Sequence, residues 1–282
     1  MAGRLSIFAG SGELVPHAVV AAKAAGYKVQ VLALTPRDDL AGVKVVSADI
    51  ANPLGIIWSL KIFRTSHIIM AGGIHLPDKA RQDLIRFAAG ADADADAAEA
   101  IAVPVGDAAL AGLAGVLKKM TGAELVGIEE IAPELLAGRG HICGPEPDQG
   151  VEQSWRQALE TAKVIGAMDI GQAAVLSGMR VIAVEDIGGT DDLITRVGDL
   201  ARAGLAGDGS TPLVLAKAMK PQQPGFADLP SIGPTTVENC ASNGISIIAV
   251  EAGRSLIVNR ASVADLADKH AITVVGVSLD DG

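Results

Sequence analysis

Short apolar runs alternate with longer mixed segments through the first half of the chain, and this alternation predicts its architecture. The apolar runs, which are the expected strands, cover residues 5–9, 29–34 and 67–71. Residues 14–25 and 56–63 have compositions typical of helices. Two of the runs end directly in glycine, at Gly10 and Gly72. Apolar strands that are separated by helices and followed by glycine predict a Rossmann-like parallel sheet, whose ligands bind beyond the carboxyl ends of the strands.

The pattern changes in the second half. Residues 139–148 contain two glycines and two prolines, a composition typical of a linker. Beyond them, pairs of apolar runs broken by glycine predict two antiparallel hairpins, residues 173–176 with 181–185 and residues 246–250 with 255–258. Helix-compatible segments lie between these pairs. We therefore expect a Rossmann-like N-terminal domain over residues 1–138, a linker over 139–150, and a C-terminal mixed α/β domain over 151–282.

Composition narrows the function classes. The chain is 49 % hydrophobic but only 2 % aromatic, so its core is built from Ala, Val, Leu and Ile, which suits an α/β fold. The formal net charge of −10 argues against non-specific nucleic-acid binding, because a phosphate backbone attracts a surplus of Lys and Arg. Cys143 and Cys240 lack metal-ligand spacing and are expected to be buried free thiols. Without a run of about 20 uncharged apolar residues or a signal-peptide pattern, we expect a cytoplasmic protein.

The glycine turns after two expected strands are candidate ligand sites. Gly10-Ser11-Gly12 precedes a helix, whose first backbone N–H groups can bind an anion. The dinucleotide fingerprint expects a third glycine where Val15 stands, so a nicotinamide cofactor is disfavoured and phosphate or nucleotide binding stays open. Gly72 and Gly73 follow another strand, and together with Gly12 they can face one ligand. Alternatively, these small residues only permit tight turns and close helix packing.

Acidic residues in the second half are candidate metal ligands. Asp191 follows a glycine turn at an expected helix start, where it can hold Mg²⁺ beside a phosphate. The alternative is that Asp191 only stabilises the helix dipole. Asp228 lies in a loop rich in Pro and Gly just ahead of a helix, where it can ligate a metal or orient a water molecule. It is equally suited to forming the turn itself.

Lys217 and Lys220 follow an expected strand and are candidate phosphate-binding residues, with a solvated surface pair as the alternative. The search for a nucleophile finds neither a G-x-S-x-G elbow nor a zinc-binding spacing among the five histidines. Turns that carry carboxylates and lysines without such a nucleophile favour metal-assisted hydrolysis. In that chemistry, electrostatic stabilisation of a phosphoryl centre provides most of the rate.

Several short motifs recur in an order that is typical of one family. They are Met70-Ala71-Gly72-Gly73, Met168-Asp169-Ile170-Gly171-Gln172, Gly188-Gly189-Thr190-Asp191, Lys217-x-x-Lys220-Pro221, Asp228-Leu229-Pro230-x-Ile232-Gly233 and Val250-Glu251-Ala252-Gly253. With these motifs the chain resembles the LpxI-type UDP-2,3-diacylglucosamine pyrophosphatases of Gram-negative bacteria. The resemblance extends over nearly the whole chain.

The resemblance implies an activity and a set of partners. Members of the family hydrolyse UDP-2,3-diacylglucosamine to UMP and 2,3-diacylglucosamine 1-phosphate in lipid A biosynthesis, with Mg²⁺ as cofactor. The family's important aspartate falls on Asp228, and we expect Asp228 and Asp191 to be catalytic and to hold the metal. Gln172 and Thr190 lie in shared motifs and are expected to bind substrate. Transient contact with the inner-membrane surface and a homo-oligomer are left open.

Two departures from the family pattern support an alternative. The usual Glu-Gly-Thr-Asp reads Gly188-Gly189-Thr190-Asp191 here, which removes one carboxylate. An acid followed closely by Arg usually precedes the Asp228 segment, where this chain has Gln222-Gln223-Pro224-Gly225-Phe226. The alternative hypothesis is therefore a catalytically weakened homologue that binds a nucleotide-linked ligand without turnover.

Overall fold

The computed structural model describes residues 3–50, 52–73, 116–148, 150–206, 209, 211–222 and 229–279. The chain divides into two compact units, each of which is described by itself. The first unit holds the described residues up to Pro133, and the second holds those from Glu134 onward.

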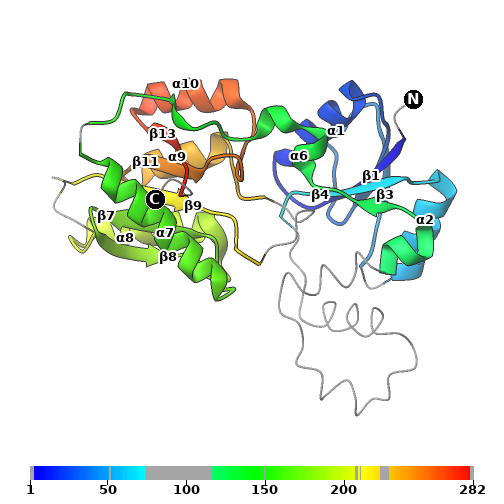
Figure 1. Ribbon diagram of the computed structural model, residues 1–282, viewed down its shortest axis with the longest axis horizontal. Helices are drawn as coiled ribbons and strands as arrows, with labels where there is room; N and C mark the ends of the chain where they lie inside the picture. Colours follow the sequence, from blue (N-terminus) through cyan, green and yellow to red (C-terminus); the bar gives the residue numbers. More distant parts are fainter. Residues whose placement is uncertain are drawn as a thin grey trace, which may run out of the picture. The chain divides into compact units, whose positions relative to one another are not determined.

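The first unit is built on a parallel five-stranded sheet (Figure 1). Its strands are β1 (Arg4–Ala9), β2 (Lys28–Ala33), β3 (Lys44–Ser47), β4 (His67–Ala71) and β5 (Glu124–Leu125). The strand order is β3-β2-β1-β4-β5, and every neighbouring pair is parallel. This order is that of a Rossmann half-sheet, so the predicted Rossmann-like fold is confirmed.

Helices in the described part of the first unit include α1 (Leu14–Ala24), α2 (Pro53–Phe63) and the short α6 (Ile128–Ile131). The start of α2 follows from local signals in the sequence. Asn52 caps α2 by accepting a hydrogen bond from the backbone N–H of Gly55 at 3.1 Å, and Pro53 takes the first helical position. Leu32, Ile57, Leu60 and Ile68 pack together where α2 covers the sheet.

The second unit is built on a mixed six-stranded sheet with the order β6-β13-β11-β9-β7-β8. The strands are β6 (Gly140–Cys143), β7 (Ala173–Ser177), β8 (Arg180–Val184), β9 (Leu213–Lys217), β11 (Ile245–Glu251) and β13 (Thr273–Val277). The central strands β9, β11 and β13 are parallel, whereas β6, β7 and β8 each run antiparallel to a neighbour. The predicted mixed α/β fold is therefore confirmed.

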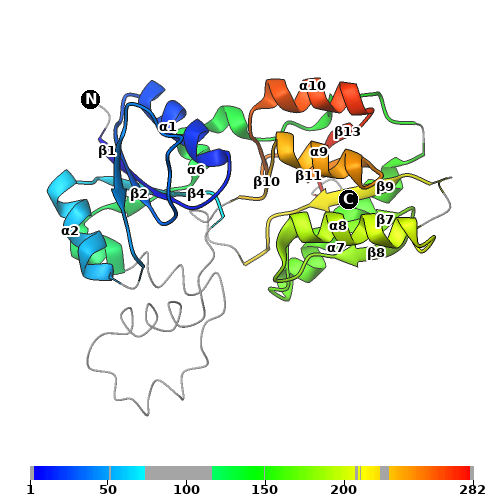
Figure 2. The ribbon, with the colours of Figure 1, turned by 180° about the vertical axis from the view of Figure 1, so that it is seen from behind.

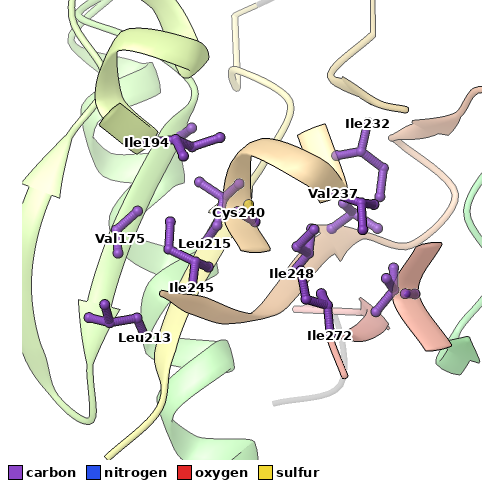
Figure 3. Packing of buried hydrophobic residues seen from close by; sticks show 14 of the residues in the cluster. Val175, Ile194, Leu213, Leu215, Ile232, Val237, Cys240, Ile245, Ile248 and Ile272 are labelled. Carbon is purple, nitrogen blue, oxygen red and sulfur yellow. The ribbon is translucent and has the colours of Figure 1, made fainter. Parts of the chain in front are cut away.

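Helices cover both faces of this sheet (Figure 2). They are α7 (Glu152–Ala167), α8 (Gly189–Arg202), α9 (Pro234–Ser242) and α10 (Arg260–His270). Successive strand residues alternate between the faces: Val214 packs with residues of α7, whereas Leu215 packs with Ile194 of α8 and Cys240 of α9 (Figure 3). The central strands are thus buried on both sides, which explains their continuous apolar runs.

The first predicted hairpin is confirmed, because β7 and β8 pair antiparallel and are joined by a turn at Gly178 and Met179. The second is wrong. β11 lies between β9 and β13, while β12 (Leu256–Ile257) pairs in parallel with β10 (Ser231–Ile232) in a small separate sheet. The backbone N–H of Gly253 donates to Ala137 rather than across a hairpin. Two apolar runs around a glycine look the same in the sequence whether they pair or diverge.

The stretch predicted as a linker, residues 139–150, contains β6, whose residues pair with β13 of the second sheet. The location of the domain boundary within it stays a prediction.

Candidate functional site

Two glycine turns meet at the switch point of the first sheet. The strand order reverses between β1 and β4, and ligands of such sheets bind at this point, beyond the carboxyl ends of the strands. The turn after β1 and the turn after β4 are joined by backbone hydrogen bonds, from Ser11 N to Gly73 O at 3.0 Å and from Gly73 N to Ser11 O at 2.9 Å. The structure thus brings Gly12, Gly72 and Gly73 together.

Close backbone contact explains two of the glycines. A Cβ atom on Gly72 would lie 2.2 Å from the carbonyl oxygen of Ser11, and one on Gly10 would lie 2.3 Å from that of Gly73. Gly72 also has φ +82°, a backbone conformation that residues other than glycine rarely adopt. Close contact between the two turns therefore accounts for glycine at Gly10 and Gly72. Gly12, by contrast, is exposed just ahead of α1, with open space where its side chain would be.

Arg37 is a further residue at this turn, and sequence reasoning missed it. Its Nη1 donates to the carbonyl oxygens of Gly10 at 3.1 Å and Gly12 at 3.0 Å, while Nη2 pairs with Asp39. The side chain is only 7 % exposed, so a positive charge is fixed against the turn. Its position three residues after the expected strand 29–34 is the signal that could have found it.

A second group of predicted residues lies at one edge of the second sheet. β9 ends at Lys217, and β11 ends at Glu251. β7 runs in the opposite direction, so that its first residue, Ala173, pairs with Lys217. Gln172 therefore lies at the same edge, as does Glu185, which directly follows β8. Residues from distant parts of the sequence are gathered here by strand direction alone.

Glu185 is a buried carboxylate that organises this edge. Its Oε2 accepts a hydrogen bond from the backbone N–H of Gln172 at 2.7 Å, and its Oε1 accepts one from the Thr190 hydroxyl at 2.8 Å. Glu185 therefore fixes Gln172 and Thr190, two of the predicted substrate-binding residues. Thr190 is the second residue of α8, which begins at Gly189, and its hydroxyl group donates to Glu185.

The two predicted lysines differ in environment. Lys217 is only 6 % exposed, and its ammonium donates to the carbonyl oxygen of Ser231 at 3.0 Å. Lys220 forms an ion pair with Asp169, at 2.6 Å between Nζ and Oδ1. Neither lysine is a freely solvated surface residue, so the alternative of a solvated surface pair does not describe them. The structure keeps both cations at the same edge of the sheet.

Glu251 supports the segment between these lysines. It is buried at the end of β11, where its Oε2 accepts from the backbone N–H of Met219 at 3.0 Å and its Oε1 pairs with Lys163 at 2.6 Å. The contact with Met219 fixes the loop that carries Lys217 and Lys220. The sequence marks Glu251 only as part of a shared motif. Its hydrogen bond to the backbone of Met219 joins residues that are far apart in the sequence, and no local pattern predicts such a contact.

Asp191 lies in the first turn of α8 and is exposed. Its Oδ1 accepts a hydrogen bond from the Asn239 side chain of α9 at 2.9 Å, which restrains its carboxylate. Asp228, the other predicted catalytic residue, lies outside the described residues. Within the described part of the chain, no three or more His, Cys, Asp or Glu side chains gather as a metal site.

Cys240 lies close to this edge but is poorly suited to be a nucleophile. Burial raises the pKa of its thiol to about 12; the nearby Lys217 ammonium opposes this shift and the Asp191 carboxylate adds to it. The thiol is therefore protonated at neutral pH, and only the thiolate reacts. The expectation of a buried thiol is confirmed for Cys240, whereas Cys143 is only partly buried.

We expect iodoacetamide at pH 8 to leave Cys240 unmodified in the folded protein. Burial also raises the pKa of Cys143, but its partial exposure should allow slow labelling. Peptide mass spectrometry after a timed reaction measures both sites, and urea-denatured protein, in which both should react, is the control. Rapid native labelling of Cys240 would show that the thiol is accessible and reactive.

Comparison with known proteins follows the same division of the chain. The LpxI N-terminal domain matches residues 4–135, and the LpxI C-terminal domain matches residues 138–275. The chain belongs to the LpxI family. One relative, the UDP-2,3-diacylglucosamine pyrophosphatase LpxI of Caulobacter vibrioides, is 34 % identical to this chain over 281 residues. This match covers 97 % of both chains, so the similarity extends over both units.

Proposed function

We propose that the protein hydrolyses the pyrophosphate bond of UDP-2,3-diacylglucosamine to give UMP and 2,3-diacylglucosamine 1-phosphate in lipid A biosynthesis. The observation that carries the proposal is the relative of this name, which matches over 97 % of both chains. The alternative of a homologue without turnover is not favoured, because the match extends over both family domains.

The electrostatics of the second unit supports this chemistry. The pyrophosphate of the substrate is anionic, whereas the chain carries a net charge of −10, so the ligand must meet local cations. Lys217 and Lys220 provide them at the edge of the sheet, where Glu185 also holds Gln172 and Thr190. Fixed charges in a partly buried site stabilise developing negative charge on phosphoryl oxygens more strongly than solvated ones do.

The first unit supports nucleotide binding by itself. Exposed Gly12 precedes α1 at the switch point, and the first backbone N–H groups of a helix favour a phosphate. In our proposal, Gly12, Gly72 and Gly73 contact the substrate there. Arg37 fixes the shape of the first turn through the carbonyl groups of Gly10 and Gly12.

Mg²⁺ is the proposed cofactor, held by Asp191 and Asp228. The environment of Asp191 fits this ion, because Mg²⁺ is usually bound by one or two carboxylates together with water and phosphate oxygens. Asp191 is exposed and its carboxylate is restrained by Asn239. When bound, the ion would neutralise charge on the phosphoryl oxygens. Asp228 would orient the attacking water and accept its proton.

We expect chelation by EDTA to stop UMP release and added Mg²⁺ to restore it. Asp191→Asn should raise the Mg²⁺ concentration for half-maximal rate on the order of tenfold, because one charged ligand is lost. Asp192→Asn, which neutralises the neighbouring exposed carboxylate, is the matched control. An unchanged Mg²⁺ dependence in Asp191→Asn would mean that Asp191 only stabilises the dipole of α8.

Turnover is tested by incubating the purified protein with UDP-2,3-diacylglucosamine and Mg²⁺ and measuring UMP by chromatography. Continuous release of UMP, proportional to protein concentration, is the expected result. Calorimetric binding of the substrate without UMP release would instead establish the alternative, a homologue that binds without turnover.

No helix within the described ranges is long and apolar enough to cross a membrane. We propose a cytoplasmic enzyme that contacts the inner-membrane surface transiently, because its proposed substrate carries two acyl chains. The oligomeric state is left open.

A further inference from the structure

Helix α2 is apolar on two opposite sides. Ile56, Ile57 and Leu60 are buried against the sheet of the first unit. On the other side, Leu54, Trp58 and Ile62 are 58 %, 67 % and 65 % exposed. These three residues are spaced by four, so they lie one above another on a single helix face. We call this face the α2 stripe; α2 is labelled in Figure 1.

The composition of the chain makes the α2 stripe unusual. Only 2 % of the residues are aromatic and only two are tryptophan, yet one of these two, Trp58, lies mostly in solvent. Single exposed apolar residues are common on protein surfaces, whereas a continuous row of large ones marks an interaction site. Tryptophan is also the residue that is enriched where proteins meet the membrane–water interface.

Charge indicates which partner the stripe fits. α2 contains no Asp or Glu, and the exposed Lys61 and Arg64 lie at its C-terminal end. This local positive charge stands out in a chain whose net charge is −10. Apolar side chains with Trp on one face and basic residues beside them are typical of helices that lie in the interface of an anionic bilayer.

A contrasting surface residue lies in the second unit. Ile187 is 99 % exposed, but it follows Asp186 directly and is close in sequence to Asp191 and Asp192. An anionic lipid surface would repel these carboxylates. Apolar exposure and positive charge coincide at α2 instead.

We propose that α2 docks the protein on the surface of an anionic bilayer. Leu54, Trp58 and Ile62 enter the boundary between headgroups and acyl chains, while Lys61 and Arg64 contact the anionic headgroups. This inference rests on the proposed function in one respect, because a diacylated substrate is available at such a surface. The docking itself needs only the stripe and its charges.

Vesicle binding tests the proposal. We expect the protein to cosediment with vesicles of phosphatidylethanolamine and phosphatidylglycerol, and much less with vesicles of phosphatidylcholine. Trp58→Ala and Lys61→Glu should each weaken binding to the anionic vesicles on the order of tenfold, through loss of apolar area and of attraction respectively. Leu205→Ser and Lys269→Glu, which change exposed residues of the second unit, are the matched controls and should bind as the parent does.

Fluorescence gives a second readout of the same face. In a Trp155→Phe background, Trp58 is the only tryptophan, so a blue shift of its emission on anionic vesicles reports its transfer out of water. Equal vesicle binding by Trp58→Ala and the parent, or absence of the blue shift, would overturn the proposal. So would a concentration-dependent dimer that Trp58→Ala abolishes in the absence of lipid, because the stripe would then be covered by a second copy.

The proposal and the proposed function fail in different ways. With substrate dispersed in detergent, Trp58→Ala should release UMP at the parent rate, since an exposed side chain contributes little to stability. Full detergent-phase activity with undiminished vesicle binding in Trp58→Ala would overturn the docking face alone. Absence of UMP release from the parent protein would overturn the proposed function. The docking proposal would still be decided by the vesicle experiment.

Discussion

Asp228→Asn is expected to lower kcat for UMP release on the order of 100-fold or more while KM changes little. In our proposal the carboxylate ligates Mg²⁺ and orients the attacking water, and both roles act mainly in the transition state. Asparagine keeps the size and most of the turn-forming capacity of aspartate but removes the charge. The backbone directly after it is anchored, because the N–H of Leu256 donates to Pro230 at 2.8 Å.

Steady-state kinetics of the folded variant measures this effect, and Asp265→Asn, which changes an exposed carboxylate of α10, is the matched control. A near-parental rate in Asp228→Asn would remove Asp228 from the catalytic group and direct attention to Asp191 and Glu185. A variant that fails to fold, judged by circular dichroism, would show that the aspartate mainly forms the turn.

Lys217→Met should lower kcat/KM by on the order of 100-fold, mainly through weaker binding of the pyrophosphate. Methionine preserves most of the length of the side chain but removes a buried cation at the end of β9. A charge held in a partly desolvated position interacts more strongly with an anion than a solvated charge does. Loss of the hydrogen bond to Ser231 should also destabilise the fold by about 1–3 kcal/mol.

Kinetics and urea unfolding of Lys217→Met separate these two effects. Lys269→Met, which removes an exposed lysine from the last turn of α10, should change neither quantity by much. Unchanged kcat and KM in a destabilised Lys217→Met protein would mean that the ammonium only supports the fold.

The sequence predicts those strands whose continuous apolar residues show that the strand is buried. β1 and β4 are continuous apolar runs ending in glycine, and both are found. β3 was missed because Lys44–Ser47 is a short, largely exposed strand without an apolar signature. The pairing of β12 with β10 also depends on contacts between distant segments, which periodicity does not contain.

The candidate site shows the same limit. Motifs place Lys217 after an expected strand and Thr190 beside a glycine turn, but the burial of Lys217 and the hydrogen bond from the backbone N–H of Gln172 to Glu185 arise only when β7, β8 and β9 align. Arg37 was missed although its position in the loop that follows β2 is a usable signal. Side-chain contacts between distant segments are set by tertiary packing, whereas the chemical type of each residue is already present in the sequence.

Product identity tests the central claim most directly. The purified protein is incubated with UDP-2,3-diacylglucosamine and Mg²⁺, and all products are quantified by liquid chromatography with mass spectrometry. Cleavage of the pyrophosphate bond predicts UMP and 2,3-diacylglucosamine 1-phosphate in equal amounts. UDP together with 2,3-diacylglucosamine lacking phosphate would show that the glycosidic bond is broken instead, and would contradict the account.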